Sequence, residues 1–146
     1  MDNLSKIFDI CGSRIKTAGD IVLHPYFFTN IYDFPILSHI DAERICLLCD
    51  YLTMLKTWET KAILLETKDV ATYFGVKLQD ICDPFRWAIC GQQNGPDLFE
   101  IAEYLGKEEV LFRLRRSFLP NYYKGIEKDL KLLVDKQRNR SEAHAD

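Results

Sequence analysis

No long apolar run occurs in this sequence of 146 residues. A helix that spans a membrane needs roughly 18 consecutive apolar residues, and the first three residues lack the basic start of a secretory signal peptide. Both absences argue against a membrane anchor and against export. We therefore expect a cytoplasmic chain without a membrane partner.

The alternation of β-branched and polar residues that marks a half-buried strand is also missing. Apolar residues recur instead every three or four positions, and at 47% of the composition they are enough to form a core. Internal repeats and low-complexity blocks are absent as well. The sequence therefore predicts an all-α protein, a helical bundle.

Apolar spacing and capping residues predict where the helices lie. We expect a helix over residues 4–16 and a short second helix that Thr17 caps. A third helix is capped by Asp41, and a fourth runs from a capping signal at Thr57–Thr60 to Gly75. A turn is expected at Asp83-Pro84. A last helix is expected over residues 126–134. We divide the chain into a helical subdomain over 1–76, a second one over 77–136 and a polar tail over 137–146.

Signatures of catalysis and of metal binding are scarce. The histidines, His24, His39 and His144, have no serine or cysteine nucleophile in a recognisable motif beside them. Cys46 and Cys49 form a Cys-x-x-Cys pair, but no second pair of cysteines or histidines stands at zinc-binding spacing. The sequence thus gives little support to a metal site or to catalysis by this chain alone.

Cysteines are odd in number and lie within apolar helical patterns. They are Cys11, Cys46, Cys49, Cys82 and Cys90. Reduced thiols that pack in a core account for this distribution better than a disulfide framework does.

Charge is unevenly distributed along the chain. Residues 1–106 contain 9 basic and 15 acidic residues, a net charge of −6, whereas residues 107–140 contain 10 basic and 5 acidic residues, a net charge of +5. A solvated helical face and a surface for an anionic partner both remain open as explanations of the basic part.

Residues 25–35 gather aromatic side chains between two prolines. A loop folded back onto the core and an exposed platform for nucleic-acid bases are the two interpretations. Base stacking requires exposed rings beside positive charge, and this segment contains no Lys or Arg. We favour the loop packed on the core.

The stretch from Pro84 to Arg116 is the most informative part of the sequence. It predicts three helices, one ending near Cys90, one over residues 97–105 and one over residues 107–116. Asp97 is the natural N-cap of the second helix, and Gly106 is the glycine that ends it. A loop rich in glycine and amides, residues 91–96, separates the first two helices, and it is neither a Walker loop nor a dinucleotide fingerprint.

Three ordered motifs in this stretch resemble one known family. Arg-Trp-Ala-Ile-Cys-Gly at 86–91, Gly-Pro-Asp-Leu-Phe-Glu at 95–100 and Leu-Gly-Lys-Glu-Glu-Val-Leu at 105–111 are similar, in order and spacing, to the anticodon-binding region of bacterial-type glutamyl-tRNA synthetases. Weaker similarity extends upstream through residues 14–17, residues 25–28 and Trp58.

The resemblance implies a recognition module without catalytic machinery. That family binds ATP, Mg²⁺ and glutamate in a domain with His-Ile-Gly-His-like and Lys-Leu-Ser-Lys-like elements, neither of which occurs here. We expect no cofactor on this chain, tRNA-Glu as its partner, a separate or missing catalytic domain, and no DNA partner.

The resemblance also implies site residues. The residues expected to contact the anticodon bases are Arg86, Gln92, Gln93, Asn94, Gly95, Pro96, Leu98 and Phe99. Those expected to contact phosphates are Arg113, Arg115 and Arg116. Most of them have an alternative role. Leu98 and Phe99 could belong to the core, Gly95-Pro96 could be an ordinary turn, and Arg86 could pair with Asp83 or Glu100. The other arginines could form helical pairs with Glu109 and its neighbours. Gln92 stands where the family often has arginine.

Two functions follow from these observations. The first is recognition of a tRNA anticodon, either as a portion of a glutamate-tRNA ligase or as a standalone relative of one. The second is a protein-interaction module that keeps this fold without RNA binding or catalysis, which the acidic body, Gln92 and the aromatic loop favour.

Overall fold

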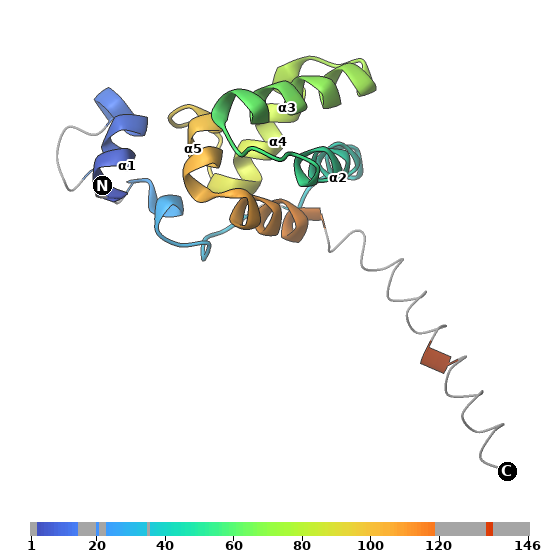
Figure 1. Ribbon diagram of the computed structural model, residues 1–146. Coiled ribbons are helices and arrows are strands. Elements are labelled where there is room, and N and C mark those ends of the chain that lie inside the picture. The colour runs from blue at the N-terminus through green and yellow to red at the C-terminus, as the bar shows by residue number, and fades with distance from the viewer. Residues whose placement is uncertain (1–2, 15–19, 21–22, 35, 119–133, 136–146) are drawn as a thin grey trace, which may run out of the picture.

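The computed structural model describes residues 3–14, 20, 23–34, 36–118 and 134–135. All regular structure in these ranges is helical, which confirms the predicted all-α class (Figure 1). The α-helices are α1 (Asn3–Cys11), α2 (His39–Thr53), α3 (Thr60–Phe74), α4 (Leu78–Cys90) and α5 (Leu98–Leu105), and residues 107–118 are helical as well. Short 3₁₀ turns occupy Gly12–Arg14 and Pro25–Phe27.

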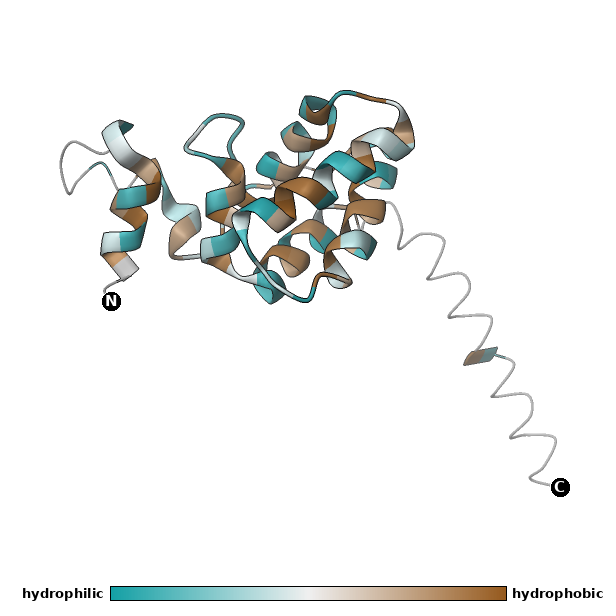
Figure 2. Ribbon diagram, turned by 45° about the horizontal axis from the view of Figure 1, so that its top comes forward, coloured by the Kyte–Doolittle hydropathy of each residue, from teal (hydrophilic) through white to brown (hydrophobic). Residues whose placement is uncertain are grey.

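Helix α3 lies at the centre of the packing, against α2, α4 and α5. Its fully buried residues, such as Ile63 and Val70, belong to one apolar core together with Leu48 and Leu52 of α2 and Ile81 and Phe85 of α4. Brown, hydrophobic segments and teal, hydrophilic segments alternate along the helices of the bundle (Figure 2). Helix burial against neighbours, rather than intrinsic propensity, is what stabilises such short helices.

Trp58 fastens the connection between α2 and α3 to α5. Its indole Nε1 donates a hydrogen bond of 2.9 Å to the carbonyl oxygen of Ala102. Lys107 makes a similar link, since its Nζ donates to the carbonyl oxygens of Thr53 and Leu55, each at 2.7 Å. The carbonyls at the C-terminal end of α2 thereby gain a cationic partner, which a helix C-terminus favours.

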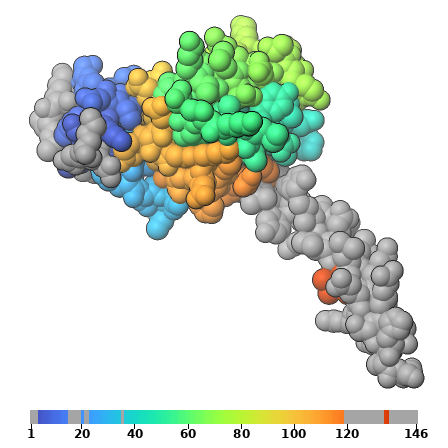
Figure 3. All heavy atoms as spheres, viewed as in Figure 1, coloured from blue at the N-terminus to red at the C-terminus, as the bar shows by residue number. Residues whose placement is uncertain are grey.

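Helix α1 lies at one end of the molecule, beside α5 (Figure 3). Ile7 and Cys11 are buried there, whereas Leu4 and Phe8 on the same helix remain 43% and 39% exposed. The α-helix ends at Cys11 and not near residue 16, because Gly12 takes a left-handed φ of 54°. The chain continues from there as a 3₁₀ turn.

Two of the predicted N-caps are wrong. Ser38, not Asp41, caps α2, since its Oγ accepts the backbone N–H of Asp41, which lies in the first turn. Helix α3 begins at Thr60 without a side-chain cap. The N–H of Thr60 donates to Oε1 of Glu103 on α5 instead, so a tertiary contact does what the capping signal was expected to do.

The turn predicted at Asp83-Pro84 is also wrong. Pro84 lies inside α4, which begins at Leu78. A proline in a helix interior removes one backbone hydrogen bond. The helix continues because Pro84 itself is buried together with Ile81, Phe85 and Ile89 on one apolar face.

The predicted ends of α5 and the predicted end of α3 are confirmed. Asp97 caps α5, its Oδ1 accepting the backbone N–H groups of Phe99 and Glu100 at 2.9 and 3.0 Å. Gly106 ends α5 and Gly75 ends α3, both at positive φ. The helix predicted over residues 107–116 continues to residue 118.

Some predictions fall outside the described residues. These are the short helix capped by Thr17, nearly all of the helix over residues 126–134 and the tail over 137–146. The division at residue 76 stays a prediction, although α3 and α4 on its two sides pack against each other. Among the helices that the structure describes, none has the length and apolar character to cross a membrane.

Candidate functional site

The loop over residues 91–97 joins α4 to α5. Gly91 ends α4 with a left-handed φ of 69°. A Cβ atom on Gly91 would lie only 2.5 Å from Cδ2 of Tyr32 and 2.9 Å from the backbone oxygen of Asp33. Only glycine therefore satisfies both the turn and the close approach of residues 32–33.

Arg86 spans this loop from its base. Its Nη1 donates a hydrogen bond of 2.7 Å to the carbonyl oxygen of Pro96. A Cβ atom on Gly95 would lie 3.2 Å from the same nitrogen, so the absence of a side chain at Gly95 makes room for the guanidinium. Arg86 is thus held by a backbone carbonyl, and not by the ion pair with Asp83 or Glu100 that the sequence suggested as an alternative.

The three amides of the loop have different surroundings. Gln92 is anchored, because its Nε2 donates to the carbonyl oxygen of Leu23 at 2.9 Å. Gln93 and Asn94 are exposed. The loop thus holds one amide in a structural contact and presents two to solvent, with both donor and acceptor groups available.

Pro96, Leu98 and Phe99 are buried. The ring of Phe99 lies edge-to-face with that of Phe85, with 6.3 Å between centroids. These positions agree with the core role considered for Leu98 and Phe99. A direct contact between their side chains and a base stays a prediction from the resemblance.

Tyr32 packs against the start of the loop, and no sequence pattern indicated its role. Its hydroxyl donates toward the carbonyl oxygens of Ala88 and Ile89, at 3.1 and 2.6 Å, in the last turn of α4. Burial raises the pKa of this hydroxyl, against the opposing charges of Arg113 and Arg116. A neutral phenol therefore satisfies carbonyls that the helix leaves without an internal partner.

Arg113 is a buried structural residue. Its side chain is 3% exposed and donates to the carbonyl oxygens of Tyr26, Ile89 and Thr29 and to Oε1 of Glu109. Every nitrogen of its guanidinium is used in these bonds. The prediction that Arg113 contacts phosphate is corrected by this burial, and its alternative, the helical pair with Glu109, is confirmed at 2.9 Å.

The other two arginines differ from Arg113. Arg115 is exposed and keeps its predicted role as a candidate phosphate contact. Arg116 is partly buried, and its Nη1 donates to the carbonyl oxygen of Asn30 at 2.6 Å. Its guanidinium also lies over the rings of Tyr32 and Phe34.

Residues 25–34 fold back onto the core, as predicted, but only in part. Tyr26 and Phe27 are buried, and His24 Nδ1 lies 2.8 Å from the Tyr26 hydroxyl. Burial lowers the pKa of His24 and raises that of Tyr26. Phe28 and Phe34, in contrast, are 56% and 38% exposed.

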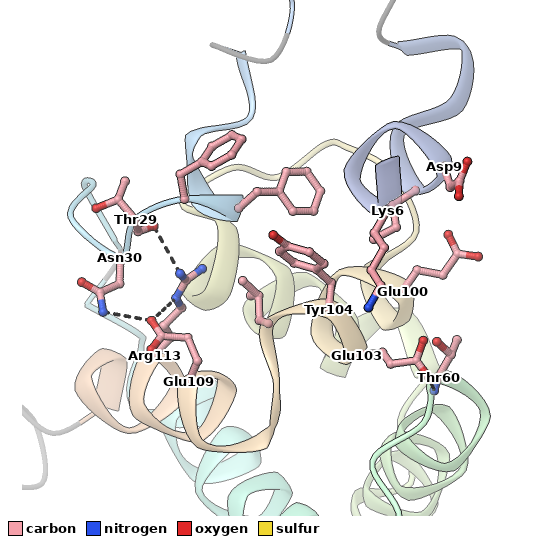
Figure 4. A pocket seen from close by; sticks show the side chains of 14 residues that line it. Lys6, Asp9, Thr29, Asn30, Thr60, Glu100, Glu103, Tyr104, Glu109 and Arg113 are labelled. Carbon is pink, nitrogen blue, oxygen red and sulfur yellow. Dashed lines mark hydrogen bonds and ion pairs between the residues drawn. The ribbon is translucent and has the colours of Figure 1, made fainter. Parts of the chain in front are cut away.

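A groove of about 1020 Å³ opens beside this segment (Figure 4). It lies between α1, α5 and the start of helix 107–118. Its ionisable lining residues are Lys6, Asp9, Glu100, Glu103, Glu109 and Arg113. Burial opposes ionisation of Glu109, but hydrogen bonds from Asn30 and Arg113 outweigh it and lower its pKa. The acidic excess makes this groove a poor site for phosphate.

The cysteines lie apart from any metal-binding arrangement in the described ranges, where no group of three possible ligands occurs. All five are free thiols. Burial raises the pKa of Cys49 and of Cys90 to about 12 and that of Cys82 to about 11. They behave as packing residues, as the sequence predicted.

The chain is similar to a known domain family and to several known proteins. A family model described as an anticodon binding domain matches residues 1–118. Similar proteins include the glutamate–tRNA ligase 2 of Rickettsia prowazekii, 32% identical over 74% of this chain, and the glutamate–tRNA ligase 1 of Rickettsia canadensis, 36% identical over 70%. In both cases the matched part is 24% of the relative.

A solved structure supports the fold. The crystal structure of a glutamate tRNA ligase from Elizabethkingia meningosepticum aligns with 79% of this chain at a TM-score of 0.72 and 20% sequence identity. The alignment covers 24% of that chain. The described chain thus spans about a quarter of the length of the relatives that it matches.

Proposed function

The chain belongs to the anticodon-binding domain family, and from this premise we propose that it recognises the anticodon of tRNA-Glu. The proposal takes its choice of tRNA from the similar proteins, which are glutamate–tRNA ligases. The site is the loop over residues 91–97 together with Arg86.

One structural observation carries the proposal. Two hydrogen bonds anchor the loop, from Arg86 to Pro96 and from Gln92 to Leu23, while Gln93 and Asn94 are exposed to solvent. Protein readers of RNA sequence work mainly on unstacked loop bases, by hydrogen bonds to base edges. An anticodon loop supplies such bases, and amides that can both donate and accept suit their edges.

Arg86 has a positioning role in this proposal. Its Nη1 is committed to Pro96, so it fixes the path of the loop. The side chain is only partly buried, which leaves the guanidinium within reach of an RNA acceptor. Arg86 therefore supports the loop and adds positive charge at the place where the RNA binds.

Glutamate–tRNA ligation needs more than this chain contains in its matched region. We propose that ATP, Mg²⁺ and glutamate bind to a separate catalytic part, because the match covers only about a quarter of the similar ligases. The chain then contributes selection of the tRNA and no cofactor chemistry.

The test measures binding of the full chain to tRNA-Glu and to the same tRNA with changed anticodon bases, at low and at moderate salt. We expect binding that weakens when the anticodon changes and when salt increases, since log K falls by about 0.7 to 0.9 per neutralised phosphate. Gln93→Ala and Asn94→Ala should each reduce the anticodon preference, by about tenfold if one base-edge hydrogen bond is lost.

Gln79→Ala is the matched control. Gln79 is an exposed amide on the first turn of α4 and bonds to Asp83. Its loss should leave the anticodon preference unchanged. Binding by the wild-type chain that ignores the anticodon would contradict the proposal and leave the fold as a protein-interaction module.

A further inference from the structure

The guanidinium of Arg116 lies among three aromatic rings. Its Cζ is 4.1 Å from the centroid of Phe34, 4.9 Å from that of Tyr32 and 5.6 Å from that of Phe112. Phe112 stands one helical turn before Arg116 on the same helix, whereas Tyr32 and Phe34 come from the folded-back segment. The structure thus assembles a cation–π cluster from parts of the chain about 80 residues apart.

Two of these rings are open to solvent. Phe112 is 51% exposed and Phe34 is 38% exposed. Arg115, the neighbour of Arg116, is exposed too. Exposed flat rings beside positive charge are the combination that binds bases of single-stranded nucleic acid by stacking.

The sequence argued against this combination because residues 25–35 contain no Lys or Arg. The fold supplies the missing charge from helix 107–118. Arg116 is held in place by its bond to the carbonyl oxygen of Asn30. Nε and Nη2 of Arg116 are buried without a hydrogen-bond partner among the described residues.

Tyr32 joins this cluster to the loop over residues 91–97. One side of its ring lies against Gly91, where a Cβ atom would be too close. The ring also lies beneath the Arg116 guanidinium. Tyr32, one ring of the cluster, therefore packs directly against the loop that bears the exposed amides.

We propose that Phe34, Phe112 and Arg116 form a stacking site for one unpaired base of the same RNA loop that residues 91–97 read. The inference rests on the proposed function. Arg116 fixes the orientation of the rings, Phe112 offers its exposed face to the base, and Arg115 lies where the adjoining phosphate passes. Because every base has a π face, this site adds affinity without choosing a sequence.

The experiment compares Phe112→Ala with the wild-type chain on the anticodon stem-loop of tRNA-Glu, by fluorescence anisotropy. We expect about tenfold weaker binding, in the range measured for loss of one base–aromatic stack. Phe112→Trp, which keeps a flat ring, should bind as tightly as the wild type. Because Phe112 is half exposed, circular dichroism should show that both variants remain folded.

A matched control and a set of modified RNAs make the test specific. Tyr73→Ala removes another exposed ring, 68% exposed at the end of α3, and should not change RNA affinity. Stem-loops that lack one loop base at a time locate the stacked base. On one of them the Phe112→Ala variant should bind like the wild type, because the partner of the ring is already gone.

The outcomes separate this inference from the proposed function. Wild-type affinity in Phe112→Ala, with anticodon preference still lost in Gln93→Ala, would overturn the stacking site and leave anticodon recognition standing. Tenfold weakening that Phe112→Trp does not restore would also overturn it. Absence of any RNA binding by the wild-type chain would overturn both.

Discussion

At the scale of single residues, Arg113 is the side chain on which most of the architecture around the site depends. It joins helix 107–118 to the end of α4 and to residues 26–29 through three backbone carbonyls. Removing a buried donor leaves its acceptors without partners, at about 1 to 3 kcal/mol for each. We predict that Arg113→Met lowers the free energy of unfolding by about 3 kcal/mol or more, measured by urea denaturation.

Arg115→Met provides the comparison for that experiment. The residue is on the same helix but is exposed, so its replacement should change the unfolding free energy by less than about 0.5 kcal/mol. Equal stability of the two variants would show that the carbonyl bonds of Arg113 contribute little.

The arginines also show what a sequence can and cannot predict about a site. Arg113, Arg115 and Arg116 lie close together in the sequence and all suggested phosphate contacts. The structure buries the first, exposes the second and stacks the third on aromatic rings. Helical spacing predicts the side of the helix on which each arginine lies. It does not predict that residues 26–34, about 80 positions earlier, cover Arg113 and Arg116, because no local pattern encodes contacts between such distant segments.

At the scale of structural elements, the junction between α4 and α5 depends on Gly91. Gly91 and Gly75 both end helices at nearly the same left-handed φ, 69° and 67°. A Cβ atom on Gly75 meets open space, whereas one on Gly91 meets Tyr32 and Asp33. Gly75→Ala should therefore cost only the left-handed backbone term, about 1 to 2 kcal/mol.

Gly91→Ala should cost more than Gly75→Ala, because the backbone term is joined by displacement of residues 32–33. Thermal unfolding of the two variants measures the difference directly. In Gly91→Ala the displaced Tyr32 should also weaken RNA binding, while Gly75→Ala should bind normally. Equal melting temperatures would argue that residues 32–33 shift away freely.

The same elements show why helix existence was easier to predict than helix boundaries. Asp97, Gly75 and Gly106 act through local geometry, and their predictions are confirmed. Asp83-Pro84 is an equally local signal, yet burial of one face of α4 overrides it. Asp41 and Thr57 failed as caps because a nearby Ser38 and the distant Glu103 supply the contacts.

At the scale of the whole molecule, the thiols report on global opening. Cys49 and Cys90 lie in the shared core, 4% and 2% exposed, and burial raises the pKa of each thiol to about 12, which disfavours the reactive thiolate. We predict that neither is alkylated in the native protein until it unfolds. Their modification rates should increase together with urea concentration, as followed by mass spectrometry.

Cys46 serves as the internal reference for that measurement. It lies on α2, one turn before Cys49, and is only partly buried. Burial also raises its pKa, but by less than the shift that brings Cys49 to about 12, so it should react first. Simultaneous reaction of Cys46 and Cys49 in the absence of urea would show that α2 opens locally.

The bonds from helix 107–118 to the segment before α2 have a consequence for synthesis of the chain. They join positions 84 to 87 residues apart. A ribosome releases the N-terminal partner first, so residues 26–34 emerge well before Arg113 and Arg116 exist. Before Arg113 and Arg116 are synthesised, helices α2, α3 and α4 can already pack against one another. The rings of residues 32 and 34 and the loop over residues 91–97 still lack the contacts that these two arginines provide. The proposed RNA site is therefore completed only late in translation, when the nascent chain has already passed residue 116.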